Sequence, residues 1–253
     1  VLGRFNSILE SHYVVCMDEA LFSGDRKNQD RLKSHISEQT IHVEAKFQPP
    51  RNIDSVHRYF ASSNHDQFAQ VEMSDRRFMF YRVSDKERQN TEYFAHVYAS
   101  INDKSSVGAL VSHLEALDIS AFQVRTRPES KEHDIQILKS LTGIQRYWFE
   151  VLSTGIFYID ALGPSIWDDE PIIKTYKLSE YYKGFNRRAD HHRPLQTNAL
   201  VCEIKHMCPS AKSERTRQDT SSKAYRGLQL PKLNIAREEF ENYLNIKIDW
   251  GEE

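Results

Sequence analysis

Two adjacent acids, Asp18 and Glu19, follow an apolar and β-branched run at residues 13–17. Such a run predicts a buried strand, and α/β sheets keep their sites at the carboxyl ends of their strands. The pair has the form of a Walker B element, in which the first acid holds Mg²⁺ through water and the second polarises the attacking water. Many strands end in two acids for solubility alone, so the pair by itself indicates only a candidate site.

Further polar groups follow in order along the chain. Residues 56–61 predict a second strand, and Asn64 just after it would place a neutral amide near a γ-phosphate or its nucleophilic water. Arg76 and Arg77 come at the start of a third predicted strand, 77–83. An arginine in this position can reach a phosphate on a neighbouring subunit, as an arginine finger does. The alternative for both arginines is salt bridging within the sheet.

Basic residues are concentrated in the second half of the chain. Between Tyr181 and Arg226 there are ten Lys or Arg and four Asp or Glu, although the net charge of the whole chain is −2. This local excess indicates a phosphate-binding footprint, and a solvated basic face is the alternative. The polar segment 212–223 predicts an exposed loop or hairpin wing. The candidate DNA-binding residues of this half are Arg187, Arg188, Arg215, Arg217 and Arg226.

The elements that must position these residues follow from the spacing of apolar residues. Alternation at 40–47 predicts one strand of a hairpin, which Pro49 and Pro50 end. The segment 155–164 reads as a linker with apolar packing, so we place a domain boundary near Thr154. Residues 246–250 predict a terminal strand or cap. Helices are predicted at 30–36, 91–117 (two helices), 131–141, 145–152, 172–185, 196–207 and 234–244.

Length and composition limit the class of protein. A chain of 253 residues suggests about two domains, and 39% hydrophobic with 28% charged residues is typical of a globular protein. No apolar run approaches the roughly 18 residues of a membrane span, so we expect no membrane partner and a cytoplasmic location, in a bacterial host or virus-encoded. The chain opens with Val1 rather than Met, and the motifs favour a fragment over a processed protein.

In combination, these residues resemble superfamily 3 helicases, specifically the primase-helicase proteins of phages and mobile elements. The match covers most of the chain, and its specificity lies in the combination rather than in single pieces. The segments that carry it are Phe5-Asn6, Asp18-Glu19-Ala20, Leu32-Lys33, Glu44-Ala45-Lys46, Ser63-Asn64, Asp75-Arg76-Arg77-Phe78, Asp118 to Pro128, Leu230-Pro231, Arg237, Phe240 and Trp250.

The resemblance implies a fold and a division into domains. The fold would be α/β, with a partial AAA+-like P-loop NTPase core at residues 1–105. A helical segment would follow at 106–154, and a winged-helix-like α+β domain that binds DNA would occupy 155–253.

The resemblance also implies roles for single residues. Asp18 and Glu19 would be the Walker B pair, with Asp18 as the acid that holds Mg²⁺ through water. Asn64 would be the sensor, and either Arg76 or Arg77 would be the arginine finger.

The same resemblance implies cofactors and partners. ATP and Mg²⁺ would drive a homo-oligomeric ring, commonly a hexamer, that pulls single-stranded DNA through its centre, and duplex DNA is a further candidate partner. Lys46, in the predicted hairpin, would grip the strand through a phosphate contact that ignores sequence. The alternative for Lys46 is an exposed pair with Glu44.

One part of the family pattern does not occur in the sequence. Nothing matches the glycine-rich Walker A loop, whose amides and lysine cradle the phosphates; the family places it upstream of Phe5-Asn6, beyond Val1. The chain alone is therefore expected to bind ATP weakly and not to turn it over.

Two classes of function remain open from the sequence. The first is the C-terminal part of an ATP-dependent DNA replication helicase or primase-helicase. The second is a DNA-binding or assembly module without ATPase activity. A hydrolase that uses Asp18 and Glu19 as acid and base is disfavoured, because adjacent residues of a strand point to opposite faces.

Overall fold

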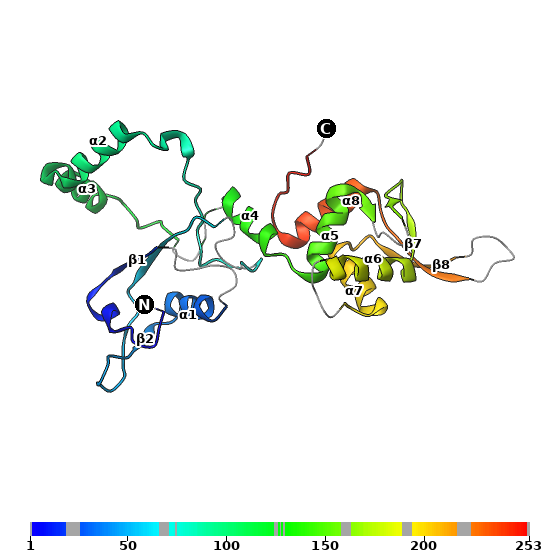
Figure 1. Ribbon diagram of the computed structural model, residues 1–253, viewed down its shortest axis with the longest axis horizontal. Coiled ribbons are helices and arrows are strands. Elements are labelled where there is room, and N and C mark those ends of the chain that lie inside the picture. Colours follow the sequence, from blue (N-terminus) through cyan, green and yellow to red (C-terminus); the bar gives the residue numbers. More distant parts are fainter. Residues whose placement is uncertain are drawn as a thin grey trace. The chain divides into compact units, whose positions relative to one another are not determined.

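The chain is a mixture of helices and small sheets in the computed structural model (Figure 1). By its internal contacts it divides into two compact units. The first comprises Val1–Cys16, Asp30–Phe60 and Ser74–His133, and the second comprises Met17–Gln29, Ala61–Met73 and Asp134–Glu253. The structure describes residues 2–18, 26–65, 71–73, 75–123, 126, 128, 130–157, 163–188, 194–216 and 224–251.

Two small sheets lie in the N-terminal part of the chain. β1 (Val14–Asp18) pairs with β4 (Arg58–Ser62), and β2 (Thr40–Val43) pairs antiparallel with β3 (Arg51–Asp54). The helix α1 (Arg26–Ser37) connects β1 to β2, and a short 3-10 helix, η1 (Ser7–Ser11), precedes β1. Alternate residues of β1 and β2 are buried, and these are Val15, Met17, Ile41 and Val43.

β1 and β4 run in the same direction. Near the start of the pair, the Arg58 N–H donates to the Tyr13 carbonyl at 2.7 Å. At its end, the Ser62 hydroxyl donates to the Asp18 carboxylate. Parallel strands need a long crossover connection, and residues 19–57 provide it. The predicted strands at 13–17 and 56–61 are thus present, each shifted by one or two residues.

The predicted strand at 77–83 is wrong. The described residues there form neither strand nor helix, and Val83 is 89% exposed. Phe80 instead packs against the ring of His133, with ring centroids 5.8 Å apart. Alternating apolar residues make a strand only where a neighbouring strand accepts and donates its backbone hydrogen bonds, and this segment pairs with none. A second 3-10 helix, η2 (Asp85–Glu87), follows it.

The two helices predicted within 91–117 are present as α2 (Thr91–Asn102) and α3 (Lys104–Glu115). Each has a side-chain cap, because Asn90 accepts from the Tyr93 N–H and Asp103 accepts from the Ser106 N–H. The helices contact each other, yet none of their residues is buried. Their exposed apolar side chains are Tyr93, Phe94, Tyr98, Ile101, Val107, Leu110, Val111 and Leu114.

The second unit has a helical core. After α4 (Lys131–Ser140) come α5 (Gly143–Thr154), α6 (Thr175–Arg188), α7 (Thr197–Met207) and α8 (Leu233–Leu244). Contacts join α5 to each of the other three helices α6, α7 and α8. The side chains with no exposed surface include Trp148, Leu152, Phe157, Leu178, Leu200, Ile204, Met207, Leu228, Phe240 and Leu244.

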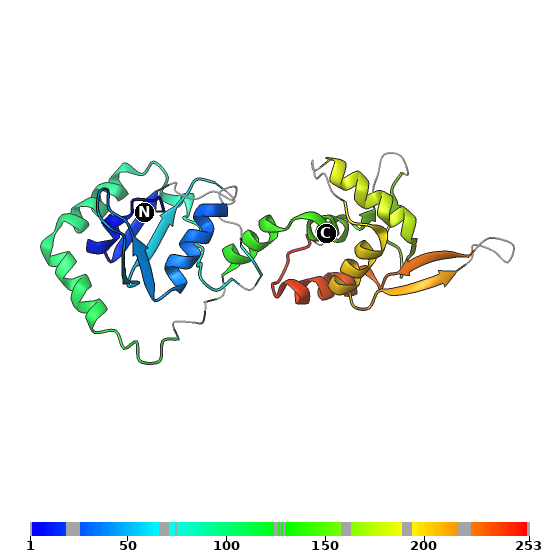
Figure 2. The ribbon, with the colours of Figure 1, turned by 90° about the horizontal axis from the view of Figure 1, so that it is seen from below.

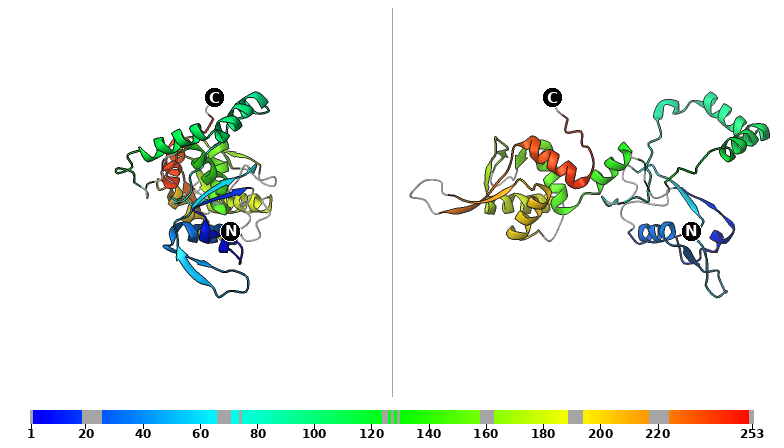
Figure 3. Two further views of the ribbon diagram at one scale, coloured as in Figure 1. Left: turned by 90° about the vertical axis from the view of Figure 1, so that its left-hand side faces the viewer. Right: turned by 180° about the vertical axis from the view of Figure 1, so that it is seen from behind.

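A three-stranded antiparallel sheet packs on these helices. β7 (Ile172–Lys174), β8 (Lys212–Thr216) and β9 (Tyr225–Gln229) lie in the order β7-β9-β8. The hairpin of β8 and β9 extends beyond the helices of its unit in Figures 1 and 2 and in the right-hand view of Figure 3. A Cβ atom on Gly227 would lie 2.7 Å from the side chain of Ile172, so the close approach of β7 to β9 needs glycine there.

The described ends of the segment predicted as a linker, 155–157 and 163–164, adjoin the elements of the second unit. Gly155, in the left-handed conformation at φ 65°, ends α5. The strand β5 (Ile156–Phe157) then pairs with β6 (Ser165–Ile166), and Phe157 stacks on Trp167 with centroids 5.6 Å apart. Two aromatic side chains that bury each other can anchor a short segment, and this contact agrees with the apolar packing expected for it.

Two more element predictions need correction. The helix predicted at 172–185 begins three residues later, because 172–174 pairs with β9 as β7. Of the terminal strand or cap predicted at 246–250, the strand does not form. The segment is irregular, and Trp250 packs on Phe149 and beneath the Arg237 guanidinium, as a cap would.

The domain division at 1–105, 106–154 and 155–253 stays a prediction. The contacts group α5 with α6, α7 and α8, whereas the sequence pattern placed a boundary near Thr154. Within the described residues, no helix has both the length and the apolar content needed to cross a membrane.

Removal of the Phe240 side chain should destabilise the second unit strongly. Phe240 has no exposed surface, and we expect Phe240→Ala to cost about 3–5 kcal/mol of unfolding free energy because it leaves a cavity. The control is Phe122→Ala, since Phe122 is 63% exposed. Urea unfolding followed by circular dichroism measures both, and equal losses would contradict this assignment of the core.

Acid should destabilise the first unit through His35. His35 is 6% exposed, and burial, aided by the charges of Arg31 and His57, lowers the pKa of its imidazole. The folded chain therefore binds this proton less readily than the unfolded chain. Stability is complete above the unfolded pKa of about 6.5 and falls as the pH drops below it. Unfolding midpoints at several pH values should fall less in His35→Gln than in the wild type.

Candidate functional site

The carboxyl ends of β1 and β4 form the first candidate site. Asp18, the last residue of β1, is exposed and accepts a hydrogen bond from the Ser62 hydroxyl at the end of β4. Asn64 lies two residues beyond Ser62 and is also exposed. Between them, the Ser63 hydroxyl accepts from the His65 N–H at 3.0 Å. Because the strands are parallel, the ends of β1 and β4 meet at one edge of the sheet. Glu19 lies outside the described residues.

This edge suits a hydrated cation. The Ser62 hydroxyl engages one oxygen of the Asp18 carboxylate, and the exposed carboxylate remains accessible to water. No cluster of three or more His, Cys, Asp or Glu suited to a metal occurs in the described residues. Mg²⁺ does not require such a cluster, since it keeps several waters and often binds one or two carboxylates together with substrate phosphates.

Arg76 and Arg77 have different surroundings. The Arg77 backbone N–H donates to Asp75 at 2.8 Å, and its guanidinium donates to the Ser37 hydroxyl at 2.8 Å and lies 3.8 Å from the Asp75 carboxylate. Asp75 itself is only 4% exposed. Arg76 is exposed and makes no hydrogen bond or ion pair with any described residue. The alternative of salt bridging thus applies to Arg77, and Arg76 is the arginine available to a partner.

Lys46 and Phe47 lie in the turn between β2 and β3. The Lys46 ammonium lies 5.1 Å from the centre of the Phe47 ring. Phe47 is 94% exposed and has a φ of 66°. Glu44, the alternative partner of Lys46, pairs instead with Arg4 at 2.9 Å.

Phe47 was missed as a functional candidate from the sequence. Its spacing continues the alternation of Ile41 and Val43, which predicts a buried position. The strand ends at Val43, and Phe47 lies in the turn. The nearby Pro49-Pro50 pair was the available signal, because it requires the turn to come before it.

The basic candidates of the second unit lie on two elements. Arg187 and Arg188 are exposed in the last turn of α6, where positive charge also stabilises the helix dipole. Arg215 and Arg226 are exposed and directly opposite each other in the β8–β9 register. Arg217 lies outside the described residues.

The opposed arginines, Arg215 and Arg226, destabilise the β8–β9 hairpin. Like charges directly across an antiparallel pair are destabilising, and no described carboxylate pairs with either guanidinium. Arg215 and Arg226 share a sheet face with Leu228, which is fully buried. The helices cover this face of the sheet near Leu228. Arg215 and Arg226 lie on the same face further along the strands, where it is exposed to solvent. A bound anion would relieve their repulsion.

Comparisons with known proteins support the fold. Residues 1–77 match the profile of DUF5906, a family of unknown function. The apo structure of the NrS-1 C terminal region (305–718) is similar to 90% of this chain, with a TM-score of 0.56 and 14% identity. The A form apo structure of the same region also covers 90% of this chain, with a TM-score of 0.49 and 16% identity.

This chain spans 57% of the first of these structures and 56% of the second. At such low identity, the first likeness shows a similar fold and leaves function to be argued from the sites. None of the curated proteins matches the chain.

The different surroundings of Arg76 and Arg77 give a stability test. Arg77→Ala should cost about 1–2 kcal/mol, because it leaves the buried Asp75 carboxylate without its cation. Arg76→Ala should change the unfolding free energy by less than about 0.5 kcal/mol. Urea denaturation measures both, and an Arg76→Ala loss as large as that of Arg77→Ala would show that Arg76 has a structural role.

Proposed function

We propose that this chain is the C-terminal part of an ATP-dependent DNA replication helicase or primase-helicase, of the type found in phages and mobile elements. The observation that carries the proposal is the parallel pairing of β1 with β4, which brings the segment that leads to Asn64 beside the Asp18 carboxylate. A motor of this kind needs an acid for its metal and a polar group for the γ-phosphate.

Each residue at this edge has a proposed part. Asp18 would hold Mg²⁺ through water, Glu19 would polarise the attacking water, and Asn64 would contact the γ-phosphate of ATP. Mg²⁺, when bound, neutralises charge that develops on the phosphates. Arg76 would be the arginine finger that reaches a neighbouring subunit, because the Arg77 guanidinium is engaged by Asp75 and Ser37.

Uncovered apolar surface supports assembly into a homo-oligomeric ring, which in the proposed family is commonly a hexamer. The helices α2 and α3 expose their apolar side chains. One face of the β1–β4 pair exposes Val14 and Phe60, although parallel sheets are usually covered on both faces. Lys46 and Phe47, at the tip of their hairpin, would contact phosphates and bases of single-stranded DNA inside the ring.

The second unit would bind DNA as a winged-helix-like domain. Its elements follow in the order α5, β7, α6, α7, β8, β9 and α8, with β7 next to β9 in the sheet. In a winged-helix domain, α6 and α7 would be the two helices of a helix-turn-helix and the β8–β9 hairpin would be the wing. Arg215 and Arg226 would contact backbone phosphates of single-stranded or duplex DNA.

The alternative is a DNA-binding or assembly module without ATPase activity. Its support is that these 253 residues contain no glycine-rich Walker A sequence. The two functions share the DNA-binding unit and differ in whether Asp18 holds a metal.

Loss of the opposed arginines should weaken DNA binding. We expect Arg215→Ala/Arg226→Ala to reduce affinity on the order of tenfold or more, because hydrogen bonds to charged groups contribute about 1.5–3 kcal/mol each. The slope of log affinity against log salt should become shallower by about two. Fluorescence anisotropy with labelled single-stranded and duplex DNA across a salt series measures both effects.

The matched control is Lys212→Ala. Lys212 is an exposed cation of β8, but it lies on the opposite sheet face from Arg215, so its removal should change affinity by less than about twofold. No binding of the wild type at low salt would overturn the DNA-binding function. An equal loss in the control would assign binding to net charge rather than to the arginine pair.

A further inference from the structure

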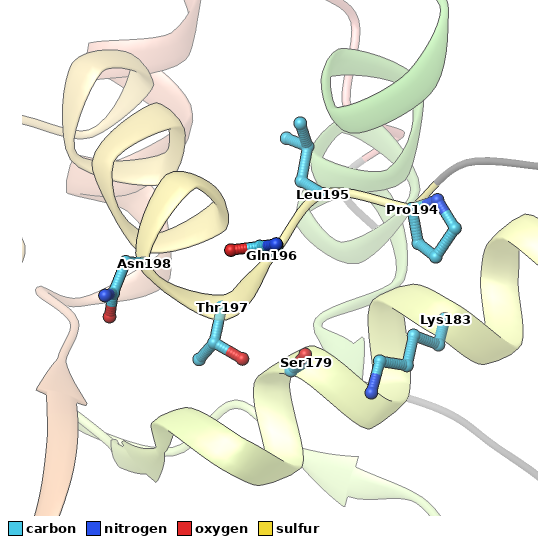
Figure 4. A pocket seen from close by; sticks show the side chains of 7 residues that line it. All are labelled: Ser179, Lys183, Pro194, Leu195, Gln196, Thr197 and Asn198. Carbon is cyan, nitrogen blue, oxygen red and sulfur yellow. The ribbon is translucent and has the colours of Figure 1, made fainter.

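A cleft lies between α6 and the start of α7 (Figure 4). Ser179 and Lys183 of α6 line one side, and residues 194–198 line the other. Its volume of about 410 Å³ is ample for a small anion. It lies on different elements from the arginine pair of the β8–β9 hairpin.

The first turn of α7 offers unsatisfied hydrogen-bond donors to this cleft. Gln196 is the N-cap of α7, and its side chain makes no capping hydrogen bond. The N–H groups of Thr197, Asn198 and Ala199 have no acceptor within the helix, and no described side chain accepts from them. The helix dipole adds partial positive charge at this end, which favours an anion.

A buried hydroxyl gives an independent indication. Ser179 is 3% exposed and lines the cleft, yet its hydroxyl makes no hydrogen bond with any described residue. The Thr197 side chain extends from α7 toward Ser179 in Figure 4. A polar side chain with so little exposed surface usually has a hydrogen-bond partner, and an acceptor held in the cleft would provide one.

The ammonium of Lys183 provides a positive charge beside the cleft. Lys183 lies one turn after Ser179 on the same face of α6, and Arg187 follows one turn later. The Lys183 ammonium bonds to the Glu180 carboxylate at 2.8 Å, and about two-fifths of each side chain is exposed, at 43% and 42%. An exposed pair of this kind contributes little, so the ammonium is able to turn to a ligand in the cleft.

We propose that this cleft binds a phosphate group of the DNA backbone. The ligands would be the first-turn N–H groups of α7, the hydroxyls of Ser179 and Thr197, and the Lys183 ammonium. Phosphate suits donors that approach from several directions, because it has more acceptor oxygens than a carboxylate. The inference rests on the proposed DNA-binding function and adds a second phosphate contact at the α6–α7 turn.

Titration of the full chain with inorganic phosphate tests the cleft. In amide nuclear magnetic resonance spectra, the signals of Thr197, Asn198 and Ala199 should shift and saturate. Ser179→Ala and Lys183→Ala should each weaken this response on the order of fivefold. Ser179→Ala should leave the melting temperature nearly unchanged, because it removes a hydroxyl that bonds to no described residue, so weaker binding would not reflect misfolding. Absence of any shift at these amides would overturn the proposal.

Duplex DNA distinguishes a backbone phosphate from free phosphate. Lys183→Ala should weaken DNA binding on the order of fivefold and lower the salt slope by about one. The control, Lys177→Ala, removes the same charge from another face of α6. If Lys183→Ala changes DNA affinity no more than this control, the assignment to DNA is overturned. If the wild type binds no DNA while its amides still respond to phosphate, the DNA-binding function fails and the phosphate site remains.

Discussion

The parallel pairing of β1 with β4 is the constraint on which the first candidate site depends. A tight turn cannot join parallel strands, so the chain must leave the end of β1 and return to the start of β4. The crossover contains α1 and the β2–β3 hairpin, which presents Lys46. The same pairing brings the end of β4 to Asp18, where the Ser62 hydroxyl fixes the distance between strand ends. The same parallel pairing thus positions both the candidate nucleotide site at the ends of β1 and β4 and the hairpin turn that carries Lys46.

The second unit holds a charged hairpin, β8–β9, on a small hydrophobic core. Leu228 and Ile173 anchor the sheet in the helical core, and Gly227 allows β7 to approach β9. Further along the same strands, Arg215 and Arg226 oppose each other without a described carboxylate between them. Core packing stabilises the domain enough to tolerate this repulsion. An arrangement that costs stability is better explained by binding than by folding.

Local sequence patterns predicted which segments form helices and strands better than they predicted what each element packs against. The β-branched run before Asp18 and the helices α1 to α8 follow from apolar spacing, which depends only on neighbouring residues. The failures at 77–83 and Phe47 depend on which distant element is available to pair or pack. The apolar spacing of α2 and α3 predicts a covered face, and no described residue covers it. The hydrogen bond from Ser62 to Asp18 also could not be predicted, because it depends on how β1 and β4 are aligned, and the sequence alone does not give this alignment.

Binding of Mn²⁺, which takes the same oxygen ligands as Mg²⁺, tests the central claim most directly. Paramagnetic broadening would be measured on the full chain by nuclear magnetic resonance, in the wild type and in Asp18→Asn. If the edge of β1 and β4 is the metal side of a nucleotide site, the Asn64 side-chain amide should broaden at low Mn²⁺ concentration. That broadening should disappear in Asp18→Asn. Broadening that spares Asn64, or that persists unchanged in Asp18→Asn, would contradict the account.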